Sequence, residues 1–199
     1  YTPTIAAVTN LDNDHLGTYQ GDMACLKKHF LSFLHRLPFY GTAILCADDA
    51  SLRALLPLIS RETVTYGFDA SAQVRLLDYE QRGLMAHFNL LWPSVSAGPI
   101  PFILPCGGRH HALNAVAAML ASHHAGASLD AVRAALPEFE GVARRFQCYQ
   151  ADWRGKTCFV VDDYGHHPNE IKATLETLRA MCPGRRVVML FEPHRYTRT

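Results

Sequence analysis

Short runs of β-branched and apolar residues alternate along the chain with longer stretches of helical period, and this order is typical of α/β folds with a largely parallel sheet. We expect strands at 4–9, 41–47, 63–68, 73–80, 84–92 and 101–108, and helices at 22–37, 49–58, 109–124 and 128–136. The segments 73–80 and 84–92 alternate apolar and polar residues, which predicts an antiparallel, half-exposed pair. The predicted architecture is therefore a mostly parallel sheet flanked by helices, with a small antiparallel part.

A second unit begins after residue 142. Two strands, 145–153 and 156–163, are joined by the turn Arg154-Gly155, and a helix at 168–181 and a strand at 185–191 follow. One strand–helix–strand unit cannot cover both faces of a parallel sheet, so we expect 143–199 to be the start of a longer domain. The chain also begins without Met and enters a strand almost at once, so we expect the first domain, 1–142, to be partial as well.

Composition argues against several classes of partner. The formal net charge is +1, so no field of one sign is available to hold nucleic acid or a membrane surface, and we expect neither as a partner. No apolar run reaches the ~20 residues that a membrane-spanning helix needs. The six cysteines are scattered, mostly in apolar runs, which predicts buried free thiols in a reducing compartment, the cytoplasm. A defined small-molecule substrate fits this composition best.

Four polar clusters each follow an expected strand, at the edge where open α/β sheets bind ligands. The densest is DDYGHHP (162–168), whose carboxylates could hold a ribose or a metal and whose tyrosine and histidines could bind a carboxylate or amine substrate. In TNLDNDH (9–15), oxygen ligands and His15 could serve a hard divalent cation. Ordinary turns and a capped helix with exposed histidines would account for the same residues, and the two interpretations stay open at this point.

The other two clusters carry arginines. GGRHHALN (107–114) places two glycines before a helix N-terminus and could bind a phosphate or a base edge, while EPHRYTRT (192–199) suits an anionic substrate. The pair Arg144-Arg145 could clamp a phosphate or form a surface ion pair. No G-x-x-x-x-G-K-[ST] phosphate loop occurs in the sequence.

Taken together, these segments resemble the Mur ligase family in order and spacing over nearly the whole chain. The matching segments are 8–22, 33–41, 108–118, 144–146, 161–170 and 192–199, of which DDYGHHP and PHRYTRT are the most specific. The resemblance implies a central ATPase domain at 1–142 and the start of a Rossmann-like C-terminal domain at 143–199. It also implies that ATP and Mg²⁺ activate UDP-N-acetylmuramate as an acyl phosphate, which the amine of L-alanine attacks, in peptidoglycan synthesis.

By motif position, the resemblance also implies roles for single residues. His15 would bind Mg²⁺, Arg145 would reach the nucleotide phosphates and Asp163 the ribose. His111 and Asn114 would face the adenine, although His111 stands where the family usually has asparagine, and a rigid imidazole cannot copy a bidentate amide. The muramate and the alanine would be contacted by Tyr164, His166, His194, Arg195 and Arg198. Of all these, His15, Arg145 and His166 would act in catalysis.

Two other activities stay open. TYQGD, FYG and the tyrosine of DDYGHHP favour the L-alanine branch of the family over the branch that recycles a tripeptide onto the same sugar nucleotide. A metal-dependent hydrolase would instead place His15 near Asp162 and Asp163 and bind zinc or manganese tightly. Because the phosphate loop does not occur in it, we expect the isolated 199-residue chain to bind ligands without ligating them.

Overall fold

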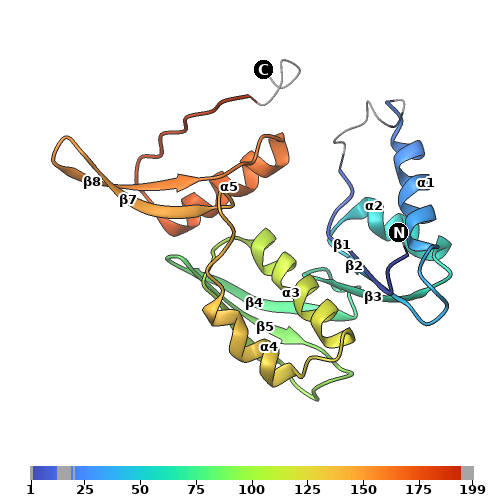
Figure 1. The fold of residues 1–199 in the computed structure, drawn as a ribbon. Coiled ribbons are helices and arrows are strands. Elements are labelled where there is room, and N and C mark those ends of the chain that lie inside the picture. The colour runs from blue at the N-terminus through green and yellow to red at the C-terminus, as the bar shows by residue number, and fades with distance from the viewer. Residues whose placement is uncertain (1, 13–18, 20, 194–199) are drawn as a thin grey trace.

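The computed structural model describes residues 2–12, 19 and 21–193. Its larger part is one six-stranded sheet in the order β1-β2-β3-β4-β5-β6 (Figure 1). Strands β1 to β4 are parallel to one another, whereas β5 pairs antiparallel with both β4 and β6. The strands are β1 (Ile5–Val8), β2 (Thr42–Cys46), β3 (Glu62–Gly67), β4 (Val74–Arg82), β5 (Met85–Leu91) and β6 (Ile100–Leu104).

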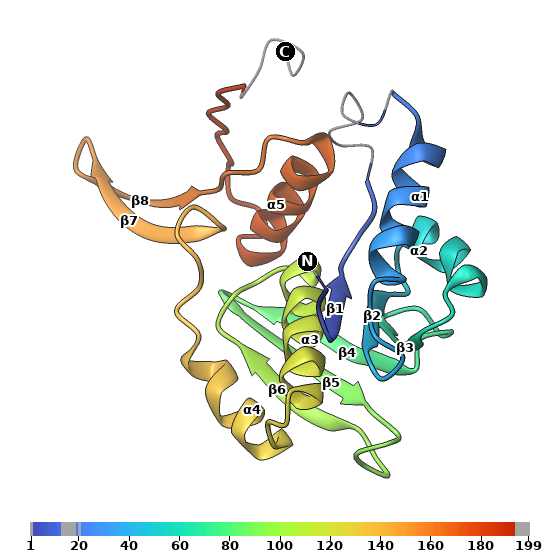
Figure 2. The ribbon, with the colours of Figure 1, turned by 45° about the vertical axis from the view of Figure 1, so that its right-hand side comes forward.

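Helices cover both faces of the parallel half. They are α1 (Met23–Leu34), α2 (Ala50–Leu55) with the 3-10 turn Leu56–Leu58, and α3 (Arg109–His124). Helix α4 (Leu129–Ala135) packs against α3, and the 3-10 turn Leu136–Glu138 that follows it packs against β6. Helix α3 lies on one side of β1 to β3, with α1 and α2 on the other (Figure 2). All five residues of β2 are buried, as expected for a strand covered on both faces. The predicted α/β architecture is therefore confirmed.

The antiparallel half has one covered face, as the alternation of its residues predicts. Burial alternates along β5 and β6, and Phe88 stacks on Phe102 with ring centroids 5.9 Å apart. Since two successive antiparallel pairings restore the direction of β4, strand β6 runs the same way as β1 to β3. Its carboxyl end therefore lies at the same edge of the sheet as theirs.

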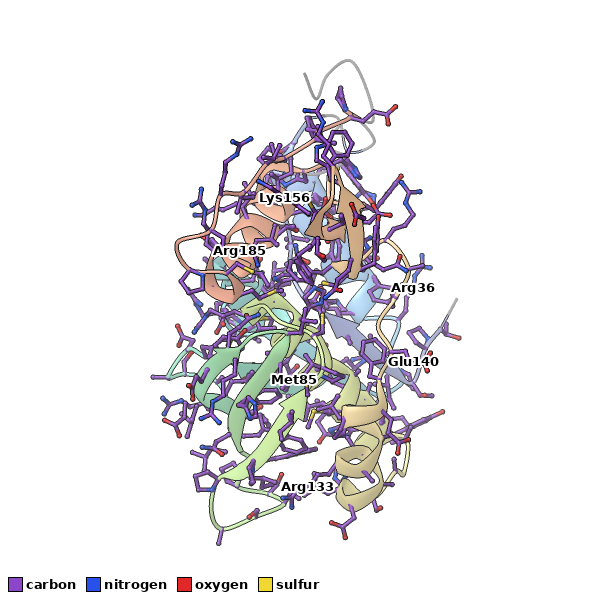
Figure 3. All side chains as sticks on the ribbon, turned by 90° about the vertical axis from the view of Figure 1, so that its left-hand side faces the viewer. Arg36, Met85, Arg133, Glu140, Lys156 and Arg185 are labelled. Atoms are coloured by element: carbon purple, nitrogen blue, oxygen red, sulfur yellow. The ribbon has the colours of Figure 1, made fainter. Side chains whose placement is uncertain are left out.

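The smaller part consists of a β-hairpin and one helix. Strands β7 (Gln147–Trp153) and β8 (Lys156–Asp162) pair antiparallel around Arg154-Gly155, both at positive φ, as tight hairpin turns require. Helix α5 (Pro168–Met181) begins with proline and a capping box and packs against α3 and β4. Figure 3 shows the two parts one above the other, with Lys156 and Arg185 in the upper and Met85 and Arg133 in the lower.

Two predictions for the smaller part are wrong. Residues 185–191 form no strand, because no strand of the described chain pairs with them, and Leu190 remains 95% exposed. The strand–helix–strand unit of a parallel sheet expected from residue 156 onward does not form either, because β8 pairs only with antiparallel β7 among the described residues. Apolar β-branched composition favours strands, but a ladder of hydrogen bonds to a neighbour is what makes one.

The cysteines and the helices bear on two further predictions. All six thiols are free, but only Cys46 is buried and the other five are half-buried, so burial was overestimated. An apolar sequence neighbourhood does not bury a thiol on a two-stranded ribbon, where Cys148 and Cys158 lie. Across the described residues, no helix has the length and apolar character needed to traverse a bilayer.

Candidate functional site

The loops that follow β1, β2, β3 and β6 share one edge of the sheet, where ligands bind in parallel α/β folds. Asp49, just after β2, organises this edge. Its Oδ1 accepts the Leu52 N–H and so caps α2, while its Oδ2 accepts the Leu11 N–H at 3.0 Å. The loop after β1 is thereby held from its start. His15, further along that loop, lies outside the described residues.

The glycine turn after β6 is built by contacts from two other elements. The Gly108 N–H donates to Tyr79 Oη and to Gln81 Oε1, both at 2.9 Å and both from β4. On the opposite side, Thr177 of α5 is buried against the turn, and its Oγ1 lies only 2.6 Å from the position a Cβ on Gly108 would take. None of these three supporting residues was predicted from the sequence, because none of them belongs to a polar cluster.

The two histidines in the first turn of α3 are half-buried. The rings of His110 and His111 lie 4.0 Å apart, and His111 is 6.0 Å from the ring of Phe146. Burial, reinforced by the neighbouring His110, lowers the pKa of His111 to about 4, so the ring is neutral. Its Nε2 atom is buried and has no hydrogen-bond partner among the described residues. A buried polar atom without a partner costs about 1–3 kcal/mol, and a ligand that bonded to it would remove that cost.

The unfolding free energy is expected to fall as the pH drops from about 6.5 to about 4. The unfolded His111 titrates near 6.5 and the folded one near 4, so between these values only the unfolded state binds the proton. The contribution is complete above pH 6.5, is lost as the pH falls through 4, and amounts to at most about 3 kcal/mol. Denaturant titrations at pH 4.5 to 7.5 measure the slope. The variant His111→Asn should flatten it, and an unchanged slope would contradict the assignment.

Arg109 and Asn114 complete this cluster on α3. The Arg109 guanidinium lies 3.6 Å from the centre of the Phe68 ring, so its plane is held by an aromatic side chain at the end of β3. Asn114 is exposed and lies three residues after His111, on the same side of the helix. The cluster therefore presents an imidazole and an amide along one face of α3.

The arginine pair and the DDYGHHP segment form one structure. Asp163 accepts the Phe146 N–H through Oδ2 at 2.8 Å and the Gly165 N–H through Oδ1 at 2.6 Å. The Tyr164 N–H donates to the Arg144 carbonyl at 2.7 Å. Each Asp163 oxygen keeps a second lone pair that a ligand hydroxyl can use.

Aromatic and cationic side chains gather around Tyr164. Its ring centre lies 4.9 Å from the Arg144 guanidinium, 5.9 Å from that of Arg145 and 5.3 Å from the His166 ring. Arg145 also lies 3.7 Å from the Glu170 carboxylate. Burial raises the pKa of Glu170, but hydrogen bonds from the His167 and His166 N–H groups, with the His166 and Arg145 charges, hold it below its usual value.

Three of the four predicted clusters meet in the structure. Asp12, from the loop after β1, accepts a hydrogen bond from Asn169 and lies 3.4 Å from His167. The ring of His111 lies 6.0 Å from the ring of Phe146, whose backbone N–H donates a hydrogen bond to Asp163. Of the fourth cluster, Glu192 and Pro193 are described, whereas His194, Arg195 and Arg198 lie outside the described residues. Among the residues that are described, no three His, Cys, Asp or Glu side chains are placed to hold a metal ion.

Comparisons with known proteins agree on one family. The model of the Mur ligase middle domain matches residues 1–122, and that of the Mur ligase glutamate ligase domain matches 144–198. Similar solved structures include MurF from Acinetobacter baumannii (TM-score 0.77, 22% identity), UDP-N-acetylmuramate-alanine ligase MurC from Thermotoga maritima (0.74, 25%) and the murein peptide ligase Mpl from Psychrobacter arcticus (0.66, 24%). They cover 90%, 91% and 94% of this chain, which in turn spans 38%, 39% and 37% of theirs.

Proposed function

This chain belongs to the Mur ligase family, and on that premise we propose that it forms part of an ATP-dependent ligase that joins L-alanine to UDP-N-acetylmuramate in peptidoglycan synthesis. The observation that carries the proposal is the meeting of three polar clusters at one sheet edge, through Asp12, His111 and Asp163. Such a meeting is what a ligase needs, because a nucleotide, a carboxylate and an amine must be held side by side.

In this proposal ATP and Mg²⁺ supply the chemical activation, and the protein side chains position the reactants. ATP would supply a phosphoryl group that turns the muramate carboxylate into an acyl phosphate, and Mg²⁺ would neutralise the accumulating negative charge. The amine of L-alanine would then attack the acyl carbon. The amide C–N bond would form as the bond from the acyl carbon to the phosphate oxygen breaks, phosphate would leave, and the nitrogen would lose its proton. The protein contributes position and charge, and Arg145 is the cation at the junction that would face the phosphates.

On the nucleotide side, we assign the base to His111 and Asn114 and the ribose to Asp163. The buried, unpaired Nε2 of His111 fits a base edge, since neutral imidazole offers one donor and one acceptor. Asp163 is held rigidly by two backbone N–H groups, so its remaining lone pairs point in fixed directions. His15, outside the described residues, remains our candidate for the Mg²⁺ ligand.

On the substrate side, we assign the muramate and alanine to Tyr164 and His166, joined by His194, Arg195 and Arg198 from outside the described residues. The Tyr164 ring is bordered by the Arg144 guanidinium and the His166 ring, which creates a cationic rim suited to carboxylates. The His166 Nδ1 atom lies 3.1 Å from the Tyr164 carbonyl, which would orient the ring. We also propose that the two domains divide at residues 142 and 143, directly before the arginine pair.

Phosphate release by the complete ligase that contains these residues tests the function. With ATP, Mg²⁺ and UDP-N-acetylmuramate, we expect release that depends on L-alanine, and none from the isolated 199-residue chain. Release that depends on a tripeptide instead would assign the protein to the recycling branch. Hydrolysis without ATP, supported by zinc or manganese, would overturn the ligase proposal in favour of a hydrolase.

A further inference from the structure

Asp12 makes a polar connection between the two parts of the molecule. Its Oδ2 accepts a hydrogen bond from the Asn169 side chain, 157 positions away in the sequence, and lies 3.4 Å from His167 Nδ1. The His167 and Asp12 side chains are only 15% and 29% exposed, so solvent screens this contact less than an ordinary surface pair. The carboxylate therefore has two partners in the first turn of α5.

The connection is anchored on the side of the larger part. Leu11, the preceding residue, is buried, and its N–H donates to Asp49 Oδ2. Asp49 is itself fixed as the N-cap of α2. Asp12 is thus held at a fixed point of the sheet edge. Its contacts with α5 therefore fix the start of α5 relative to the loop after β1.

It is anchored on the side of α5 as well. His167 is the N-cap of α5, and Glu170 at the third helical position accepts the N–H groups of both His166 and His167. Glu170 also faces Arg145 at 3.7 Å. The helix N-terminus therefore lies between two carboxylates, Asp12 from one part and Glu170 from the other, and the positive end of the helix dipole suits both.

We propose that Asp12 is a positioning residue that couples the loop carrying His15 to the loop carrying Tyr164 and His166. In this role it acts through His167 and Asn169. Phosphoryl transfer requires the muramate carboxylate to come within about 3–3.5 Å of the γ-phosphorus of ATP, so the groups that hold the two must keep a fixed separation. The inference rests on the proposed function, because it assigns the loop carrying His15 to the Mg²⁺ of the nucleotide and the loop carrying Tyr164 and His166 to the muramate and alanine.

Kinetics of Asp12 variants in the complete ligase test this role. Asp12→Ala should lower kcat by about 10- to 100-fold while the KM for ATP stays within about twofold, because Asp163 and His111 are untouched. Asp12→Asn keeps an oxygen for Asn169 but loses the charge beside His167, and should lose less. In an Asn169→Ala background the loss from Asp12→Ala should shrink to under about threefold. Asp130→Ala, on the distant helix α4, is the matched carboxylate control and should keep kcat.

Hydrogen exchange separates this inference from the proposed reaction. Asp12→Ala should speed exchange of the 164–171 amides by about tenfold and leave those of α3 unchanged, whatever amino acid the enzyme turns out to ligate. Failure of L-alanine ligation with this exchange pattern intact would overturn only the function. Unchanged exchange with kcat within twofold, or faster exchange throughout the larger part with a lowered melting temperature, would overturn the positioning role.

Discussion

Replacing Asp163 by alanine is expected to lower kcat/KM of the complete ligase at least about 100-fold and to destabilise it by about 3 kcal/mol. The carboxylate accepts the N–H groups of Phe146 and Gly165, so its removal leaves two donors unpaired and frees the loop that holds Tyr164. The same change would remove the proposed ribose contact. Steady-state kinetics with ATP as the varied substrate, together with denaturant unfolding, measure both effects.

Asp162 is the matched control for this prediction. It is the adjacent carboxylate, at the end of β8, and its side chain makes no hydrogen bond to any other described residue. We expect Asp162→Ala to change kcat/KM by less than about fivefold. Equal losses at both positions, or an Asp163→Ala enzyme within threefold of the parent, would contradict the assignment of Asp163.

A methyl group on Gly108 is expected to destabilise the protein by about 3 kcal/mol and to lower its melting temperature by about 6–12 °C. Gly108 has φ +107, a conformation that L side chains rarely adopt. The added Cβ would also lie 2.6 Å from Thr177 Oγ1 and 2.8 Å from His110 Cε1. Thr177 cannot easily give way, because it is buried and its hydroxyl donates to the Ala173 carbonyl.

Gly126→Ala separates the backbone strain of this change from the collision. Gly126 has φ +100, and nothing lies within 4 Å of its Cβ position, so its substitution should cost only about 1–2 kcal/mol. The double variant Gly108→Ala, Thr177→Ala should be more stable than Gly108→Ala alone, because the colliding oxygen is gone. A Gly108→Ala protein as stable as the Gly126→Ala protein would show that no collision occurs. Thermal denaturation of the variants provides the comparison.

Local signals in the sequence account for most of the fold. The antiparallel pairing of β4 with β5 follows from their alternating residues, and the start of α5 follows from Pro168. The features that these signals miss depend on which segments pair with one another. Residues 185–191 have strand composition but no neighbouring strand in the described chain, and the irregularity in β4 at Asp78, with φ +51, has no local signature. Pairing is a property of two segments, so one segment cannot specify it.

The sequence also predicts only part of the candidate site. The position of His111 after an expected strand was enough to place it at the carboxyl edge of the large sheet, whereas Asp163 follows a strand of the separate antiparallel hairpin, which the rule for parallel sheets does not cover. The supports of the glycine turn, Tyr79 and Gln81, were not predictable, because a polar residue on a half-exposed strand ordinarily faces water. The pairing of Asp12 with the start of α5 was equally hidden, since it depends on how two separate units pack.

Asp49 supports both a helix and a loop at this edge of the sheet, so a substitution there affects both. One of its oxygens caps α2 and the other holds the backbone of Leu11, so a single side chain serves both a helix and the loop after β1. Serine or threonine would preserve the cap, as helix N-termini generally tolerate, but a single hydroxyl oxygen on a shorter arm would have to serve both donors. A substitution that preserves the cap of α2 would therefore still loosen the start of the loop after β1.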